Sequence, residues 1–398
     1  MKKELQDLLV QRYKYVLIAM AVFFVGLSLY ETKVSISNWK EAETEVTGKK
    51  GEASFYKEIK DKNSYPDGKM TLYYDVNNGD KVFSTDDFEE YKEARLEVFP
   101  DKPDQQSVFG SYLNESYFLM IVVTIICGFS LFFYDNKTNF NTLLFSSKFK
   151  KKEIYQAKLK IVGGTLLLSL VVSKLLKLAG LTLFIPREHL NASFTDLLPS
   201  QIVLTTCLVA IFIVSSFAGV ILGEWITGVI TISVFWYMLS AFLSGLSVTY
   251  YTLTNKNFQN LEWFSINNYF ELSKKGFPEV IIPTLFFLLI SFVLLFWGEK
   301  IFKKLSLENN GKYLMDDSLR RPVQIVFLIF VFFVTKGPGL IEAIKIKVTG
   351  INPYGQYEPS VVSAMIMTVI ILLVAFMIST TVIYRKNPFK FKKNQENE

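Results

Sequence analysis

Several runs of mostly apolar residues, each close to 20 residues long, restrict the fold of this chain more than any other feature. An α-helix needs about 20 apolar residues to cross the hydrocarbon core of a bilayer. Half of the 398 residues are hydrophobic, 15% are aromatic, and the mean hydropathy is +0.27. The pattern therefore predicts an all-α polytopic membrane protein.

We expect about eight transmembrane helices, preceded by a charged, amphipathic helix at the membrane interface over residues 1–14. The run after Arg321 holds only 14 apolar residues before Lys336. Loop charge nevertheless favours a crossing there, because without it the basic tail would lie outside. The expected spans are 15–30, 117–134, 159–185, 201–222, 226–248, 280–298, 322–340 and 361–383.

The distribution of charge orients these helices. Residues 31–116 carry 19 acidic and 12 basic side chains, although the whole chain has a net charge of +6. Short loops rich in Lys and Arg face the cytoplasm. This places the loops 135–158 and 299–321 and the tail 384–398 inside, with both termini, and the segments 31–116 and 249–279 outside. A basic balance of this kind points to orientation by the inner leaflet of a plasma membrane rather than to nucleic acid. The abundance of Lys, Asn, Ile and Phe suggests a bacterial source with an AT-rich genome.

A small extracellular α+β domain is expected between the first and second spans. Residues 70–76 and 81–84 alternate as in strands, and the Asn-Asn-Gly-Asp turn between them favours a β-hairpin. Residues 86–94 resemble a short helix, with Thr85 or Asp86 as its N-cap. Residues 95–100 alternate like a further strand. The carboxylates of this segment are dispersed, which is typical of a solvated surface.

Asp135–Lys160 is a strongly basic stretch between two apolar runs. Its hydrophobic residues are interleaved with small polar ones, which predicts an amphipathic helix beside the membrane surface. Such a helix has two plausible partners, namely lipid headgroups and another protein. The basic residues are Lys137, Lys148, Lys150, Lys151, Lys152, Lys158 and Lys160.

This stretch resembles the first cytoplasmic loop of type-two ABC exporter permeases, the membrane subunits that pair with a separate ATPase. That loop has an acidic residue, a Leu-Leu-x-Ser stretch, a basic tract, Glu-Ile and Ala/Ser-Lys. This chain departs from it at Phe140-Asn141-Thr142, where Gly-Thr is usual, and at Ser147, where Pro is usual. The matching residues are Asp135, Leu143-Leu144-Phe145-Ser146, Lys150-Lys151-Lys152, Glu153-Ile154 and Ala157-Lys158.

The resemblance implies a transport subunit that is not itself an enzyme. The loop 135–158 would act as a coupling helix seated on an ABC ATPase, and ATP and Mg²⁺ would bind to that partner chain. The family also implies a second permease, either another copy or a paralogue. Its substrates include peptides, lipid-linked molecules and drugs, and some members protect cells from antimicrobial peptides. The residues expected to couple are Leu144, Phe145, Ser146, Lys150, Lys151, Lys152 and Glu153.

Lys174 and Lys177 lie within the third apolar run. At about 1.5 Å per residue they are ~21–26 Å from Lys160, near the outer headgroups. One interpretation is that both side chains snorkel to the headgroups. The other is that they line the translocation path and meet an anionic group, since ionisable residues at membrane depth are often functional.

Other functions stay open from the sequence alone. No G-x-x-x-x-G-K-[ST] loop is present, and His189 is the single histidine, so neither an ATPase nor a His-rich zinc site is indicated. A membrane enzyme for lipid-linked substrates would need outer carboxylates such as Glu262, Glu271, Glu279 and Glu358. A secondary transporter would need matching halves, which the sequence does not show. A sensor or immunity protein without transport is a further alternative.

Overall fold

The computed structural model describes residues 3–48, 50–61, 64–75, 81–100, 105–107, 113, 116–254, 277–305, 311–350 and 360–384. Most of the expected outer segment 249–279 and nearly all of the tail 384–398 lie outside these ranges. So do parts of the segments 31–116 and 299–321.

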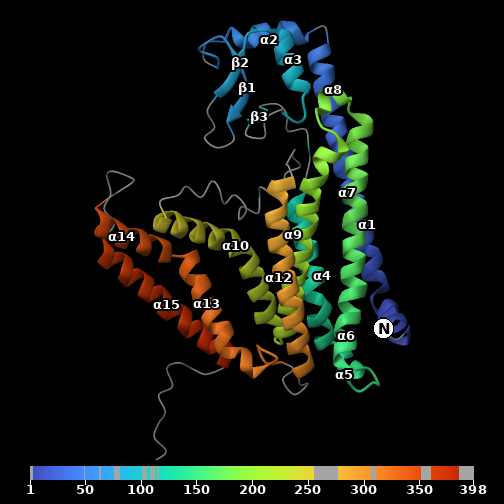
Figure 1. Ribbon diagram of the computed structural model, residues 1–398, viewed down its shortest axis with the longest axis vertical. Helices are drawn as coiled ribbons and strands as arrows, with labels where there is room; N and C mark the ends of the chain where they lie inside the picture. The colour runs from blue at the N-terminus through green and yellow to red at the C-terminus, as the bar shows by residue number, and fades with distance from the viewer. Residues whose placement is uncertain are drawn as a thin grey trace, which may run out of the picture. The chain divides into compact units, whose positions relative to one another are not determined.

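The described chain is dominated by long apolar helices (Figure 1). Seven of them are long and apolar enough to cross a membrane, or up to eight if α13 and α14 together form one span. The chain is therefore consistent with an all-α multi-pass membrane protein. α6 (Lys151–Lys158) and α7 (Gly164–Phe184) together make one of these candidate spans. The other helices are α1 (Lys3–Thr47), α4 (Tyr117–Lys137), α9 (Phe194–Ile221), α10 (Trp225–Thr254), α12 (Phe277–Lys304), α13 (Arg320–Val334), α14 (Gly337–Thr349) and α15 (Val361–Tyr384).

The first helix is much longer than expected. We expected an interfacial helix over 1–14, a span over 15–30 and an outer domain from residue 31. In the structure α1 is one helix of 45 residues, about 67 Å long at 1.5 Å per residue. Beyond residue 31 its buried side chains, which include Ser35, Trp39, Ala42 and Val46, recur every three or four residues. This spacing gives the helix a continuous packed face.

The expected span 322–340 is interrupted. α13 ends at Val334, α14 begins at Gly337, and the two helices are bent by 62°. Proline near the start of α14 explains the break, because Pro338 lacks the N–H needed to continue the helix. Several other helices exceed their expected limits. α9 starts at Phe194 and contains Pro199, α10 continues to Thr254, and α12 extends from Phe277 to Lys304.

The segment between α1 and α4 combines helices and strands. α2 (Gly51–Ile59) is followed by β1 (Met70–Asp75), β2 (Lys81–Thr85), α3 (Phe88–Leu96) and β3 (Gln105–Ser107). The sheet order is β2-β1-β3, with β1 antiparallel to both neighbours. The expected hairpin is therefore present, and its turn, residues 77–80, lies outside the described residues.

Two local expectations for this segment are wrong. The N-cap of α3 is Asp87, not Thr85 or Asp86, and its carboxylate accepts hydrogen bonds from the N–H groups of Glu89 and Glu90. Residues 95–100 do not form a strand, because α3 extends to Leu96, and the third strand is Gln105–Ser107.

The chain divides into two compact units. The first comprises Met1–Cys127, Gln156–Ile213 and Tyr269–Val293. Within it, α1 and α7 pack side by side. A buried cluster joins the end of α1 to α3, to α8 (Arg187–Leu190) and to α9. Trp39 belongs to this cluster and donates its indole N–H to the carbonyl of Leu96 at 3.0 Å.

We expect Trp39→Phe to loosen this attachment by about 1 kcal/mol, the typical net contribution of one hydrogen bond. Phenylalanine keeps an apolar ring in the cluster but leaves the buried Leu96 carbonyl without its donor. The measurement is amide hydrogen exchange of residues 94–99, which should become faster. Trp225→Phe is the control, since Trp225 is half exposed, and it should leave that exchange unchanged. Unchanged exchange in Trp39→Phe would contradict the prediction.

The second unit comprises Gly128–Tyr155, Val214–Asn268 and Leu294–Glu398. Its helices meet through aromatic rings and small residues. The rings of Phe242 on α10 and Phe330 on α13 stack with centroids 5.0 Å apart. Gln324 on α13 donates its amide to Ser379 and Thr380 on α15, each at 3.1 Å. Packing and polar contacts therefore both hold α13 against its neighbours.

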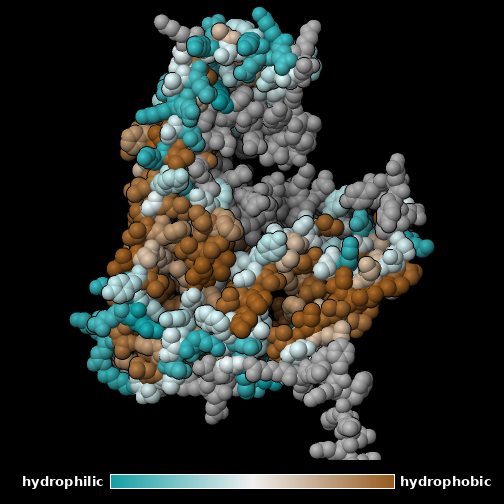
Figure 2. Space-filling view, turned by 180° about the vertical axis from the view of Figure 1, so that it is seen from behind, coloured by the Kyte–Doolittle hydropathy of each residue, from teal (hydrophilic) through white to brown (hydrophobic). Residues whose placement is uncertain are grey.

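Apolar side chains cover the outside of the long helices. Figure 2 shows hydrophobic surface over these helices and hydrophilic surface over the α2–α3 segment. In water so many exposed apolar side chains would be unfavourable. Contact with lipid removes that cost, so this surface fits a protein that lies in a bilayer.

Candidate functional site

Residues 138–150 connect two candidate spans through a short helix. α4 ends at Lys137, and α5 (Phe140–Phe145) follows after Asn139, which adopts a left-handed backbone conformation with φ of 55°. Asparagine tolerates this conformation better than most residues. The Asn141 side-chain amide then donates a hydrogen bond to Asn136 at the end of α4. The chain thus turns sharply from α4 into α5.

The two leucines of α5 have opposite environments. Leu144 is 1% exposed, whereas Leu143 is 56% exposed. Ser146 follows α5 as its C-cap and is also exposed. The sequence predicts that Leu144 contacts a partner, but its side chain is buried within this chain, and the exposed leucine is Leu143.

Phe145 and Lys151 attach this segment to the end of α12. The Lys151 Nζ lies 4.8 Å from the centre of the Phe145 ring and donates a 2.7 Å hydrogen bond to the carbonyl of Leu305. The Phe145 ring also meets Phe302 edge-on, with centroids 5.5 Å apart. These contacts hold the inner side of the segment in place.

The remaining basic residues have different roles. The Glu153 carboxylate accepts a hydrogen bond from the Lys150 backbone N–H at 3.1 Å, which stabilises the first turn of α6. Lys152 forms a 3.4 Å ion pair with Glu299 on α12, and Lys303 contacts the same carboxylate at 2.7 Å. The side chains of Lys148 and Lys150 remain exposed. Leu143 on α5 and Lys148 and Lys150 after it are thus exposed, and we call these three residues together the α5 face.

A second loop of the same unit is closed by a β-bridge. Leu222, between α9 and α10, pairs antiparallel with Leu314. The hydroxyl of Tyr313 is hydrogen-bonded to Thr231 at 3.0 Å, and burial raises the pKa of Tyr313.

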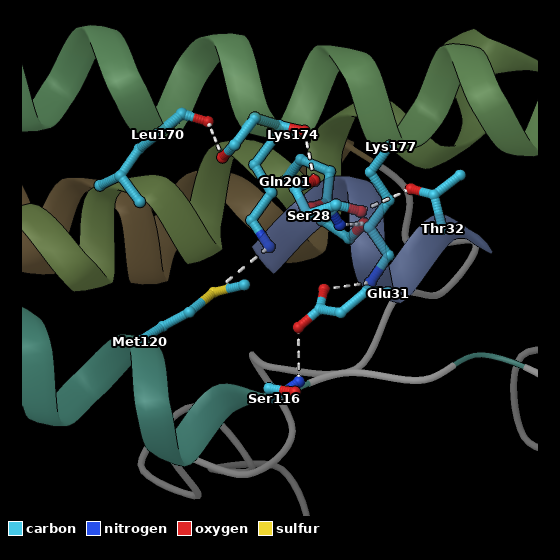
Figure 3. A network of polar contacts seen from close by, with 11 residues as sticks. Ser28, Glu31, Thr32, Ser116, Met120, Leu170, Lys174, Lys177 and Gln201 are labelled. Atoms are coloured by element: carbon cyan, nitrogen blue, oxygen red, sulfur yellow. Dashed lines mark hydrogen bonds and ion pairs between the residues drawn. The ribbon is translucent and has the colours of Figure 1, made fainter. Parts of the chain in front are cut away.

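In the first unit, an ion pair is buried among the long helices (Figure 3). The Lys177 Nζ on α7 lies 3.1 Å from the Glu31 Oε2 on α1, and both side chains are 0% exposed. The Glu31 Oε1 accepts the backbone N–H of Ser116, just before α4, at 2.6 Å. Glu31 thus contacts two other segments of the chain at once.

Lys174 lies one turn from Lys177 and is also nearly fully buried. Its Nζ is 3.7 Å from the Met120 sulfur on α4. Lys174 and Gln201 also help to line a largely apolar pocket of about 240 Å³ between α7 and α9. Figure 3 shows Lys174 and Lys177 on the same helix, with Met120 near the former and Glu31 near the latter.

These positions bear on the first interpretation of the lysines. Lys177 does not snorkel to the headgroups, because its amino group is paired inside the protein with Glu31, a carboxylate that the sequence predicts in the outer segment. The second interpretation, that both lysines line a translocation path, stays a prediction. The available signal was a carboxylate directly after an apolar run, while lysines lay inside another run. Only the packing of α1 against α7 reveals the pair.

Other carboxylates named from the sequence do not add a site. Glu262, Glu271 and Glu358 lie outside the described residues, as does the side chain of Glu279. Within the described ranges no group of three or more His, Cys, Asp or Glu side chains could hold a metal ion.

The described helices and their apolar surface place this chain among multi-pass membrane proteins. Comparisons with family models, with curated proteins and with solved structures find no match. A more specific function therefore rests on the local chemistry of the described residues.

Proposed function

We propose that this chain is the permease subunit of an ABC exporter and that residues 135–158 couple it to a separate ATPase. The observation that carries the proposal is the α5 segment, a short helix between two candidate spans. Its inner side is fixed to α12 by Phe145 and Lys151, while Leu143, Lys148 and Lys150 remain exposed. A rigid helix with exposed apolar and basic residues can bind in an acidic groove of the ATPase. When the ATPase moves, the helix then moves with it and displaces the helices on either side.

The rest of the proposal follows from this assignment. ATP and Mg²⁺ bind to the partner ATPase, and a second permease, identical or paralogous, completes the translocation path. Both termini and the α5 face lie in the cytoplasm of a bacterial cell, and the α2–α3 segment lies outside. Lys174 and Lys177 belong to helices near that path. The substrate class is a peptide, a lipid-linked molecule or a drug.

The test is purification of the protein from its native membrane in mild detergent, followed by an assay of vanadate-sensitive ATPase activity and identification of copurified chains by mass. We expect a stoichiometric ATPase. The triple variant Leu143→Ala, Lys148→Ala, Lys150→Ala should recover about tenfold less, because removal of a buried leucine anchor alone costs ~1.5–3 kcal/mol.

A matched control removes exposed charge elsewhere. Lys300→Ala with Lys304→Ala deletes two exposed lysines of α12 and should retain the ATPase. Equal losses in both variants would show general charge attraction and would remove the role of the α5 face. Absence of any ATPase, under conditions that preserve a known ABC complex, would overturn the proposed function.

A further inference from the structure

The two oxygens of the Glu31 carboxylate have different partners. Oε2 pairs with Lys177 of α7, and Oε1 accepts the backbone N–H of Ser116. Because Glu31 itself belongs to α1, one side chain joins three segments that are distant in sequence. Complete burial of the pair makes these contacts strong, since water does not compete for the charges.

Ser116 is at the point where α4 begins. Its carbonyl accepts the N–H of Met120 at 3.2 Å, which is the first hydrogen bond of the helix. The N–H groups at the start of a helix have no acceptor within the helix, and a negative charge there is favourable. Glu31 supplies both an acceptor and a negative charge, and so it fixes the start of α4.

The Glu31 contacts lie far along α4 and α7 from the α5 segment, which joins these two helices. α4 leads into residues 138–150, and α6 leads out of them through a π-helical turn (Leu159–Gly163) into α7. Ser116 precedes Lys137 by about 31 Å of helix, and Lys177 follows Lys151 by about 39 Å. Both attachments to Glu31 are therefore about one membrane thickness along the helices from the α5 segment.

We propose that Glu31 is a positioning residue that fastens the start of α4 to α1 and α7, so that the helices before and after the α5 segment share one fixed point. In a permease, a movement of the α5 segment then pivots α4 and α7 about this point. The pivoting role rests on the proposed function, whereas the fastening does not.

Contacts between α1 and α7 that do not involve Glu31 make it possible to test the attachment of α4 separately from the stability of the α1–α7 pair. The Ser28 hydroxyl donates to the Ser173 carbonyl at 2.6 Å, and a Cβ at Gly180 would overlap the Thr32 methyl group, so these helices also touch away from the ion pair. Loss of the Ser116 contact should therefore loosen the first turn of α4, which keeps its Met120–Lys174 contact, without separating α1 from α7.

The experiment measures distances between spin labels on the full chain in lipid nanodiscs. Labels at Leu29 and Phe118 report on α1 and α4, and labels at Leu29 and Leu176 report on α1 and α7. All three positions are exposed, and Cys127 and Cys207 are replaced by Ala. Ser116→Pro removes the N–H that Glu31 accepts, and Ser116→Ala retains it.

We expect a single narrow 29–118 distance in the parent and in Ser116→Ala. In Ser116→Pro a second population should rise by about tenfold or more, the factor expected for a lost hydrogen bond to a charged acceptor. The 29–176 distance should stay the same in all three.

The charge-swapped variant Glu31→Lys with Lys177→Glu restores the ion pair but leaves no acceptor on residue 31 for the Ser116 N–H, and its 29–118 distance should resemble that of Ser116→Pro. A 29–118 distance that is identical in Ser116→Pro and Ser116→Ala, or that the swap restores, would overturn the fastening.

The pivot is tested in the complex copurified with the ATPase. Trapping with ATP and vanadate should leave the distance between labels at Phe118 and Leu176 unchanged in the parent and shift it in Ser116→Pro. A shift in the parent would overturn the pivot. If no ATPase copurifies, both the proposed function and the pivoting of α4 and α7 about Glu31 are overturned. The attachment of α4 by Glu31 is then still tested by the label distances in the isolated chain.

Discussion

Lys177→Met is expected to lower the free energy of unfolding by about 3–5 kcal/mol, which is typical when one partner of a buried ion pair is removed. The substitution leaves the fully buried Glu31 carboxylate without its cation, and the Ser116 N–H is the contact that remains. Neither water nor lipid can replace the ammonium group at this position. Unfolding in mixed detergent micelles measures the change.

One control variant and one double variant test the physical cause of this loss of stability. Lys160→Met changes an exposed lysine at the base of the same helix and should alter stability by well under 1 kcal/mol. The double variant Glu31→Gln with Lys177→Met removes both charges and should recover most of the loss, because a neutral pair has little desolvation penalty. If the double variant is as unstable as Lys177→Met, burial of an unpaired charge is not the cause.

Gly219→Ala is the second change with a large expected effect. In the second unit a Cβ at this position of α9 would overlap the backbone carbonyl oxygen of Phe129 on α4. A backbone atom cannot move aside as a flexible side chain can, so the two helices must separate. We expect the free energy of unfolding to fall by about 1–3 kcal/mol, the usual cost of overpacking. Hydrogen exchange near residues 129–133 should also become faster.

Gly26→Ala is the matched control. Gly26 lies in α1, and apart from its chain neighbours and the adjacent backbone of α1 no atom is within 4 Å of the position that its Cβ would occupy. Alanine there should be neutral or stabilising by about 0.5–1 kcal/mol, because glycine in a helix loses more conformational entropy. Equal effects at both positions would show that helix propensity, and not the contact with α4, determines the result.

The long helices were predictable because crossing a bilayer requires a length of apolar sequence that short-range patterns report directly. The continuation of α1 to Thr47 was missed because its composition is polar. Its signal was the spacing of Ser35, Trp39, Ala42 and Val46, which is helical although the residues between them are charged. Hydropathy locates spans, whereas periodicity locates the faces that pack.

The candidate site was predictable only in part. The position of the α5 segment follows from charge and from the flanking apolar runs. Which leucine is exposed does not, because Leu143 and Leu144 are adjacent and a single residue of helical rotation, about 100°, exchanges their environments. Glu31 could not be matched to Lys177 from the sequence, since 146 residues separate them and the pairing depends on which helices are neighbours.

The π-helical turn Leu159–Gly163 sets the rotational phase of α7. In a regular α-helix Lys158 and Lys177 would point about 100° apart, since 19 residues exceed five whole turns by one residue. A π-turn accommodates one additional residue and removes about that angle, which brings the two lysines to the same side, and both are 0% exposed. Deletion of a single residue here would leave the composition of α7 intact and yet turn Lys177 away from Glu31. The length of this short turn, as much as the identity of the charged residues, therefore determines whether the ion pair can form.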